Sequence, residues 1–135
     1  MKRAALAFLL VAVAGCGTQS QPSSVDRFND PDQRAVAQKI EDLETAGKRG
    51  KPEDICSDIL AKTLVSQLDA AGTSCANEMQ KAIDDANDFD LEVRKITVTG
   101  TKATAEVQQG DDGPTETMEF AKQGNDWRAT ALSGR

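Results

Sequence analysis

The sequence predicts an α+β domain in which three N-terminal helices pack on a curved antiparallel sheet of about four strands. Up to about residue 86, apolar residues recur every three or four positions, which is helical spacing. After residue 90, apolar and polar residues alternate, which is strand spacing. Helices followed by strands favour a two-layer arrangement with the helices on one face of the sheet.

The first sixteen residues have the composition of a secretion signal. Lys2 and Arg3 form a short positive region, and residues 4–13 form a brief apolar stretch. This stretch is shorter than the roughly 20 residues that a membrane-spanning helix needs. Residues 13–16 (VAGC) resemble the bacterial lipobox, which implies that residues 1–15 are a lipoprotein signal peptide and that Cys16 is lipidated. An ordinary secretory signal with an incidental cysteine is the alternative.

Lipidation of Cys16 would hold the protein at the extracytoplasmic face of the cell membrane. Each buried methylene of an acyl chain contributes about 0.8 kcal/mol, so several chains give stable anchoring. Residues 16–29 are rich in Ser and Gln and have too few apolar side chains to build a core, so we expect a flexible tether. Residues 30–135 are long enough for a single α+β domain.

The charge of the chain argues against two classes of partner. The formal charge is −6, and loss of Lys2 and Arg3 with residues 1–15 makes it −8. Because the chain has no histidine and no basic stripe, it suits neither a phosphate backbone nor an anionic lipid surface. We therefore expect no nucleic-acid partner, and contact with the membrane through Cys16 alone.

The first helix is predicted to begin at Asp30 and Pro31. Asp30 can cap it, Pro31 fits its first turn, and Gln33 stands at the capping-box position. Residues 47–50 (GKRG) should end it, because glycine and basic residues favour a helix C-terminus. Small and apolar residues recur on its inner face: Val36, Ile40, Leu43 and Gly47.

Residues 54–79 carry both cysteines that remain after Cys16. Pro52 suits a first turn and Gly72 suits a helix end, so one continuous helix is predicted between them. Ser74 can cap a third helix over residues 75–86. The apolar stripe of the second helix comprises Ile55, Ile59, Leu60, Leu64, Val65 and Leu68.

Cys56 and Cys75 most simply form a disulfide between these two helical segments, provided that they lie outside the cytoplasm. A loop of roughly twenty residues closed in this way stabilises the fold by about 3 kcal/mol in the chain-entropy model. Two buried free thiols are one alternative. Metal ligation is another, but no histidine completes a site. The acidic residues 84–90 also lack the glycine and the ligand spacing of a calcium loop, so no metal is predicted.

The last third of the chain predicts four strands. Leu91 and Val93 share one phase and Ile96 and Val98 the other, which indicates a bulge at residues 94–95. Three further strands are expected around residues 103–107, 118–122 and 127–131, with glycine-containing turns between them.

The inward-facing residues of these strands predict a candidate pocket. Small alanines alternate there with large side chains, and the room that they leave can hold an apolar ligand or the first helix. Both readings remain open from the sequence. The candidate pocket residues are Trp127, Met118, Phe120, Ala105 and Ala129.

The order of these elements, the cysteines in the helical half and the closing Gly-x-x-Trp-Arg of residues 124–128 resemble small secreted or lipid-anchored actinobacterial domains of the nuclear transport factor 2-like (cystatin-like) superfamily. The resemblance covers about residues 31–132. It implies a cone of three helices wrapped by a bent sheet, often with a cavity at the wide end.

Enzymes of that superfamily are isomerases and dehydratases that usually place His, Asp or Tyr in the cavity. This chain has neither His nor Tyr, and Glu106 and Glu119 fall in the outward strand phase. We therefore predict a non-catalytic domain without a cofactor that binds a small apolar ligand. A protein–protein interaction module of the cell envelope is the alternative, and an isomerase or dehydratase is less favoured.

Overall fold

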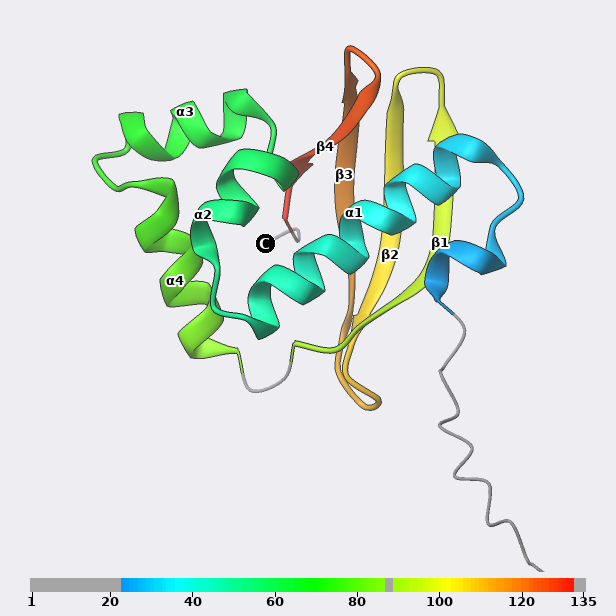
Figure 1. Cartoon of the computed structure of the whole chain (residues 1–135), viewed down its shortest axis with the longest axis horizontal. Helices are drawn as coiled ribbons and strands as arrows, with labels where there is room; N and C mark the ends of the chain where they lie inside the picture. Colours follow the sequence, from blue (N-terminus) through cyan, green and yellow to red (C-terminus); the bar gives the residue numbers. More distant parts are fainter. Residues whose placement is uncertain (1–22, 87–88, 133–135) are drawn as a thin grey trace, which may run out of the picture.

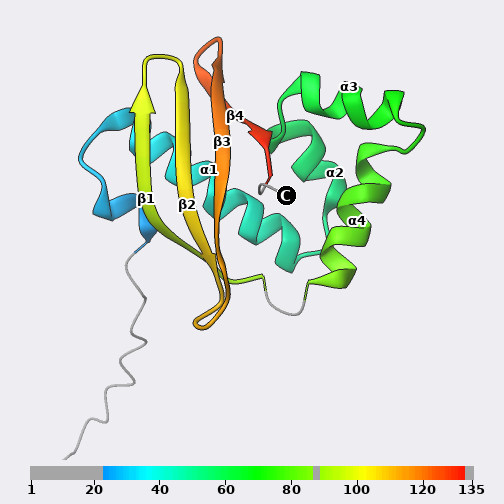
Figure 2. The same ribbon diagram turned by 180° about the vertical axis from the view of Figure 1, so that it is seen from behind.

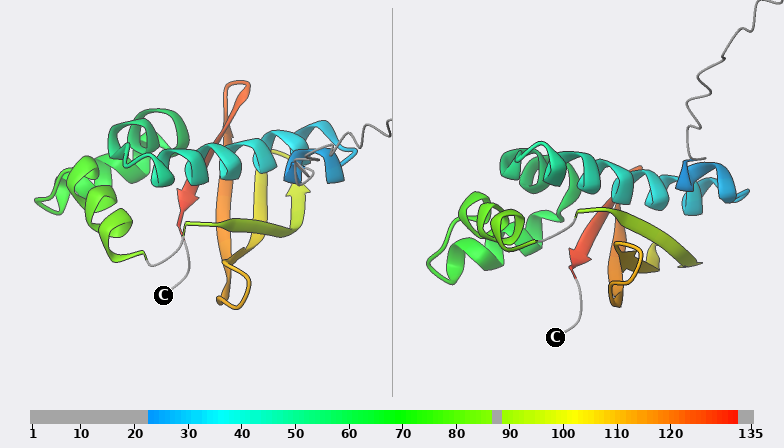
Figure 3. Two further views of the ribbon diagram at one scale, coloured as in Figure 1. Left: turned by 60° about the horizontal axis from the view of Figure 1, so that its bottom comes forward. Right: turned by 90° about the horizontal axis from the view of Figure 1, so that it is seen from below.

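Four strands form one antiparallel sheet in the order β1-β2-β3-β4 in the computed structural model, which describes residues 23–86 and 89–132. The strands are β1 (Leu91–Thr99), β2 (Lys102–Gln109), β3 (Thr115–Gln123) and β4 (Asp126–Ala131). All helices precede them along the chain, and α1 runs across one face of the sheet (Figures 1 and 3). The prediction of an α+β domain with a four-stranded antiparallel sheet is confirmed.

The helical elements are η1 (Ser24–Arg27), α1 (Pro31–Lys48), α2 (Pro52–Asp54), η2 (Ile55–Ile59), α3 (Lys62–Ala70) and α4 (Cys75–Asp85). α1 faces the sheet, whereas α3 and α4 lie beside it, beyond β4 (Figure 1). We call residues 62–86 the α3–α4 lobe. Seen from behind, the opposite face of the sheet carries none of the described helices (Figure 2).

α1 begins and packs as the sequence predicts. The Asp30 carboxylate accepts hydrogen bonds from the backbone N–H groups of Asp32 and Gln33 at 2.9 and 3.0 Å, which caps the helix. The helix buries one stripe against the sheet: Val36, Ala37, Ile40, Leu43, Ala46 and Gly47.

The predicted continuous helix between Pro52 and Gly72 is wrong. The chain forms α2, then a π-helical turn (η2) closed by a 3.0 Å hydrogen bond from Leu60 N–H to the Ile55 carbonyl, and then becomes extended before α3. At the break, Leu60 pairs with Ala129 of β4, and Ala61 N–H donates to the Ala129 carbonyl at 2.8 Å. Pairing with the edge of the sheet therefore replaces helical hydrogen bonds at this point. The described helices accordingly exceed the three expected.

The ends of the α3–α4 lobe follow the prediction. Gly72 has φ +84°, a left-handed conformation that suits glycine just after α3. The Ser74 hydroxyl accepts a hydrogen bond from Asn77 N–H at 3.2 Å and caps α4.

The bulge predicted at residues 94–95 is confirmed, because the register of β1 against β2 shifts between Val93 and Lys95. A second irregularity, not predicted, lies between Glu119 and Phe120, where β3 pairs with β4. Bulges increase the local twist of a sheet.

The tether was predicted to reach residue 29, but the described part of that stretch belongs to the domain. η1 is capped by Ser23, and the apolar side chains of Val25 and Phe28 pack against the core. The Ser23 hydroxyl also donates to the Glu41 carboxylate of α1 at 2.7 Å. Residues 1–22, including the predicted signal peptide, Cys16 and the rest of the tether, lie outside the described residues.

Candidate functional site

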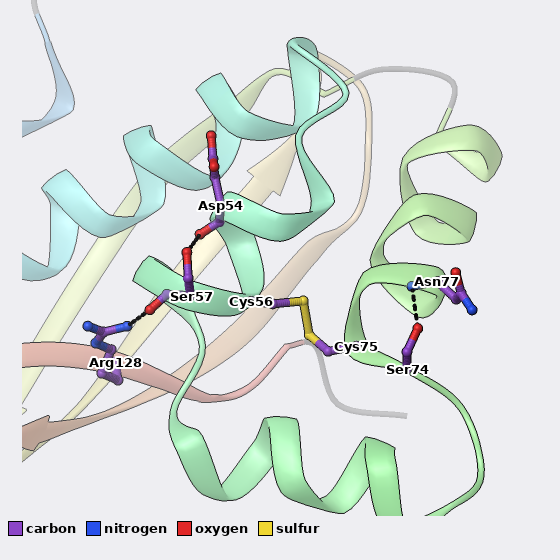
Figure 4. Close-up of a disulfide and its surroundings, with 7 residues drawn as sticks. All are labelled: Asp54, Cys56, Ser57, Ser74, Cys75, Asn77 and Arg128. Carbon is purple, nitrogen blue, oxygen red and sulfur yellow. Dashed lines mark hydrogen bonds between the residues drawn. A yellow bond between two sulfur atoms is a disulfide. The ribbon is translucent and has the colours of Figure 1, made fainter.

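The predicted cysteine pair is present as a disulfide. Cys56 and Cys75 have a Cα–Cα distance of 6.1 Å and join η2 to the first residue of α4 (Figure 4). Cys75 is 4 % exposed, whereas Cys56 is only partly buried. Ser57, next to Cys56, accepts a hydrogen bond from the Arg128 guanidinium of β4 through its carbonyl. This hydrogen bond attaches the residue next to Cys56 to β4 of the sheet.

All five candidate pocket residues lie in the packed core. Ala105 and Ala129 are fully buried, and Trp127, Phe120 and Met118 are 1, 2 and 6 % exposed. They belong to one cluster with apolar residues of α1 and η2, among them Val36, Ile40 and Ile59. Helix side chains therefore share the core with the small alanines. Whether an apolar ligand can also enter stays a prediction.

Three hollows lie elsewhere on the described surface. One of about 560 Å³ lies between η1, α1 and the start of β1, and one of about 510 Å³ lies at the β2–β3 turn. A third, of about 380 Å³, lies on the sheet face opposite α1. Of the five candidate residues, Phe120 alone lines any of these three, and it lines the third. None of them is the apolar inner pocket that was predicted.

Two side-chain contacts each shift the pKa of a charged group, the carboxyl of Asp32 and the amine of Lys48. Asp32 at the start of α1 accepts hydrogen bonds from Lys122 Nζ at 2.9 Å and from Trp127 Nε1 at 3.0 Å, and these bonds lower the pKa of its carboxyl group. The hydrogen bonds that Lys48 makes with Asp90 and Glu44 raise the pKa of its amine. Both shifts favour the charged form, so neither group is tuned to exchange protons near neutral pH.

The described residues hold no group of three or more His, Cys, Asp and Glu side chains placed to bind a metal ion. The same part of the chain has no buried polar or charged residue. Glu106 and Glu119, placed in the outward phase by the sequence, are both exposed. Residues 23–86 and 89–132 therefore contain no buried acid–base pair.

The sequence interpretation missed the outer face of the sheet, which we define as the exposed side of β1, β2 and β3 opposite α1. Thr97 lies opposite Thr104, which in turn lies opposite Glu119, and all three are exposed. The signal was in the alternation itself, because threonine occupies alternate positions at the end of β1 (97 and 99) and at the start of β3 (115 and 117). The exposed threonines of this face are Thr97, Thr99, Thr104, Thr115 and Thr117.

Both edges of the sheet are engaged by other parts of the domain. On β1, the Val93 carbonyl accepts a 2.6 Å hydrogen bond from Arg27, and the Ile96 carbonyl accepts a 3.0 Å bond from Gln33. On β4, the Ala129 carbonyl accepts a hydrogen bond from Ala61 N–H. Occupied edges disfavour the addition of a strand from another chain.

Among residues 23–86 and 89–132, none of the helices combines the length and the apolar character that a membrane-spanning helix needs. No protein-family model matches the sequence, and no curated protein matches it either.

Proposed function

We propose that this protein is a lipid-anchored bacterial lipoprotein of the extracytoplasmic face whose domain is non-catalytic and acts by contact with another protein of the cell envelope. The observation that carries the proposal is the contrast between the two faces of the sheet. The inner face is filled by α1 and η2, whereas the outer face is exposed and none of the described helices covers it. An exposed regular face is the part of this domain best suited to contact.

The composition of the outer face supports a role in protein contact. Threonine is β-branched and stiff at χ1, so a threonine side chain loses little conformational freedom when a partner orders it. Its hydroxyl can both donate and accept a hydrogen bond. Lys102, Glu106 and Glu119 add charges of both signs to the same face, which suits a mixed polar protein surface better than a lipid headgroup layer or a nucleic acid.

The superfamily resemblance remains part of this proposal. Helices that precede a simple antiparallel meander, with the inner face of the sheet covered, are compatible with a nuclear transport factor 2-like cone. The wide end of such a cone often holds a ligand. In this domain, a small apolar ligand would have to enter the buried cluster that Ala105 and Ala129 share with helix side chains, so ligand binding is the weaker alternative.

Lipidation is tested by mass spectrometry of the protein isolated from its own membranes. We expect a mature N-terminus at Cys16 that carries acyl chains, and we expect Cys16→Ala to remain unprocessed or to appear in the medium. An unmodified mature N-terminus at any other residue would overturn the anchor.

Contact through the outer face is tested by site-specific photo-crosslinking in intact cells. A photoreactive residue at Thr104, in the middle of the outer face, should give one discrete crosslinked product. The matched control is Thr63, an exposed threonine of α3, which lies beside the sheet and outside the outer face. Equal products at both positions, or no product at Thr104, would reject the outer face as the contact. Lys95 of β1 is exposed and lies opposite Glu106 on the outer face. Lys95→Glu and Glu119→Lys should each weaken the Thr104 product while leaving the fold intact.

A further inference from the structure

The Cys56–Cys75 disulfide joins two parts of the chain that differ in how firmly they are held. Cys56 belongs to η2, whose Ile55 and Ile59 are 1 and 2 % exposed in the core. Cys75 is the first residue of α4. The 19-residue separation between the cysteines contains the whole of α3 (Figure 4).

The α3–α4 lobe buries little of its own surface. α3 has no buried residue, and Cys75 is the single buried residue of α4. The apolar side chains that face the core remain only partly buried: Leu64, Val65, Leu68, Met79 and Ile83. Cys75, one half of the disulfide, is therefore the most buried residue of these two helices.

The chain on either side of the lobe is fixed independently of the disulfide. Before the lobe, Leu60 and Ala61 are 1 and 0 % exposed and are bonded to Ala129 of β4. After it, the Phe89 ring lies against Gly47 of α1. These two anchors lie on either side of residues 62–86 and attach the chain to β4 and α1 through residues outside the lobe.

We propose that the Cys56–Cys75 disulfide is a redox-sensitive clasp whose reduction opens the α3–α4 lobe while α1 and the four strands stay folded. Closure of a loop of this length favours the closed lobe by roughly a hundredfold in equilibrium constant. The partly buried apolar contacts of α3 and α4 hold the lobe weakly once that constraint is lost, because exposed contacts contribute less than buried ones.

The difference in burial between Cys56 and Cys75 decides which of the two sulfur atoms an incoming thiolate attacks first. An incoming thiolate reaches the partly exposed Cys56, forms a new S–S bond with its Sγ and breaks the bond to Cys75. The electron pair leaves on Cys75 Sγ, at the N-terminus of α4, where the helix dipole stabilises a negative charge. When the reductant is a dithiol, its second thiolate then attacks the mixed disulfide and releases Cys56. The dithiol is oxidised to a disulfide, and both cysteines take up protons as thiols.

Hydrogen–deuterium exchange of the mature full-length protein, with and without dithiothreitol, tests the clasp. Reduction should speed amide exchange in residues 62–86 by about tenfold or more, with exchange in α1 and β1–β4 unchanged. Faster exchange throughout the domain, or unchanged exchange in residues 62–86, would overturn the proposal. The double variant Cys56→Ser with Cys75→Ser should show the reduced pattern without reductant and should not respond to it, which separates the disulfide from other effects of dithiothreitol.

The order of attack is tested with glutathione. Brief treatment, acid quenching and peptide mapping should find the mixed disulfide on Cys56. A glutathione adduct predominantly on Cys75 would overturn the assignment of Cys56 as the attacked residue.

Discussion

In the half of the molecule formed by α1, η2 and the sheet, most of the large apolar side chains are buried, whereas in the α3–α4 lobe Cys75 is the single buried residue. Val36 and Ile40 of α1 are both 0 % exposed, as are Ala105 and Ala129 of the facing strands. The lobe instead relies on its caps, its partly buried stripe and the disulfide.

The difference shows two ways in which a small domain is stabilised. A helix that crosses a sheet removes a large apolar area from water, and that burial is the main favourable contribution to folding. The helix pair α3 and α4 lies beside the sheet and not across its face, so it buries less, and a crosslink that restricts the unfolded chain compensates. Substitutions in the two regions should therefore differ in their effect on the free energy of unfolding.

The largest difference is expected between Trp127 and Leu68. Trp127→Ala should lower the free energy of unfolding by about 3–5 kcal/mol, because it empties a fully packed site and removes the indole hydrogen bond to Asp32. Leu68→Ala in α3 should cost about 1 kcal/mol, since that side chain is already partly exposed. Guanidinium denaturation of the oxidised proteins, followed by circular dichroism, measures both. Equal losses would contradict the comparison.

The next prediction concerns the small residues under α1. Ala105→Phe and Ala129→Phe should each cost about 1–3 kcal/mol, because both side chains are fully buried in the core cluster beneath α1. Ala82→Phe, on an exposed position of α4, is the control and should change stability little. If instead both core variants were as stable as the wild type, and apolar molecules shifted the fluorescence of Trp127 in the wild type but not in the variants, a ligand pocket would replace the filled core.

Features set by neighbouring residues could be predicted from the sequence. The cap at Asp30, the cap at Ser74 and the bulge at residues 94–95 all follow from short-range geometry. The pairing of Cys56 with Cys75 also followed, because the assignment of Cys16 to the lipobox left a single pair of cysteines.

Features set by distant residues could not be predicted. The spacing of Ile55, Ile59 and Leu60 fits one helical stripe, yet the chain leaves the helix at Leu60 to pair with Ala129, far along the sequence. Likewise, the alternation of small and large residues showed which side chains face inward, but size alone does not say whether a helix or a ligand fills the space beside Ala105.

A third prediction concerns the packing of Gly47 in α1 against Phe89, which lies just after the α3–α4 lobe in the sequence. Glycine inside a helix is normally about 1 kcal/mol less favourable than alanine, but a Cβ at Gly47 would overlap the Phe89 ring. Gly47→Ala should therefore lower the free energy of unfolding by about 1 kcal/mol, because the ring must move from its packed position. In a Phe89→Ala background the same substitution should stabilise. Loss of stability in both backgrounds would assign the effect to a contact other than Phe89.

The smallest effect is expected at Asp32, which joins the start of α1 to the β3–β4 hairpin at the end of the sheet. The hydrogen bond from Lys122, followed by that from Trp127, lowers the pKa of the Asp32 carboxyl below its ordinary value of 3.8. A lowered folded-state pKa stabilises the fold at pH values above the ordinary value, and this stabilisation is lost as the pH falls through the folded-state pKa.

Asp32→Asn should therefore be slightly less stable than the wild type at pH 7, and the stabilities of the two proteins should converge at acid pH. Added salt should narrow the difference at pH 7, because the contact is partly exposed and screened. Asp42→Asn, an exposed substitution on α1 outside this contact, is the control for general charge effects. Thermal unfolding of the three proteins between pH 7 and pH 2 measures these differences in stability. If the difference between Asp32→Asn and the wild type did not depend on pH, the charge of Asp32 would not be what joins α1 to the hairpin.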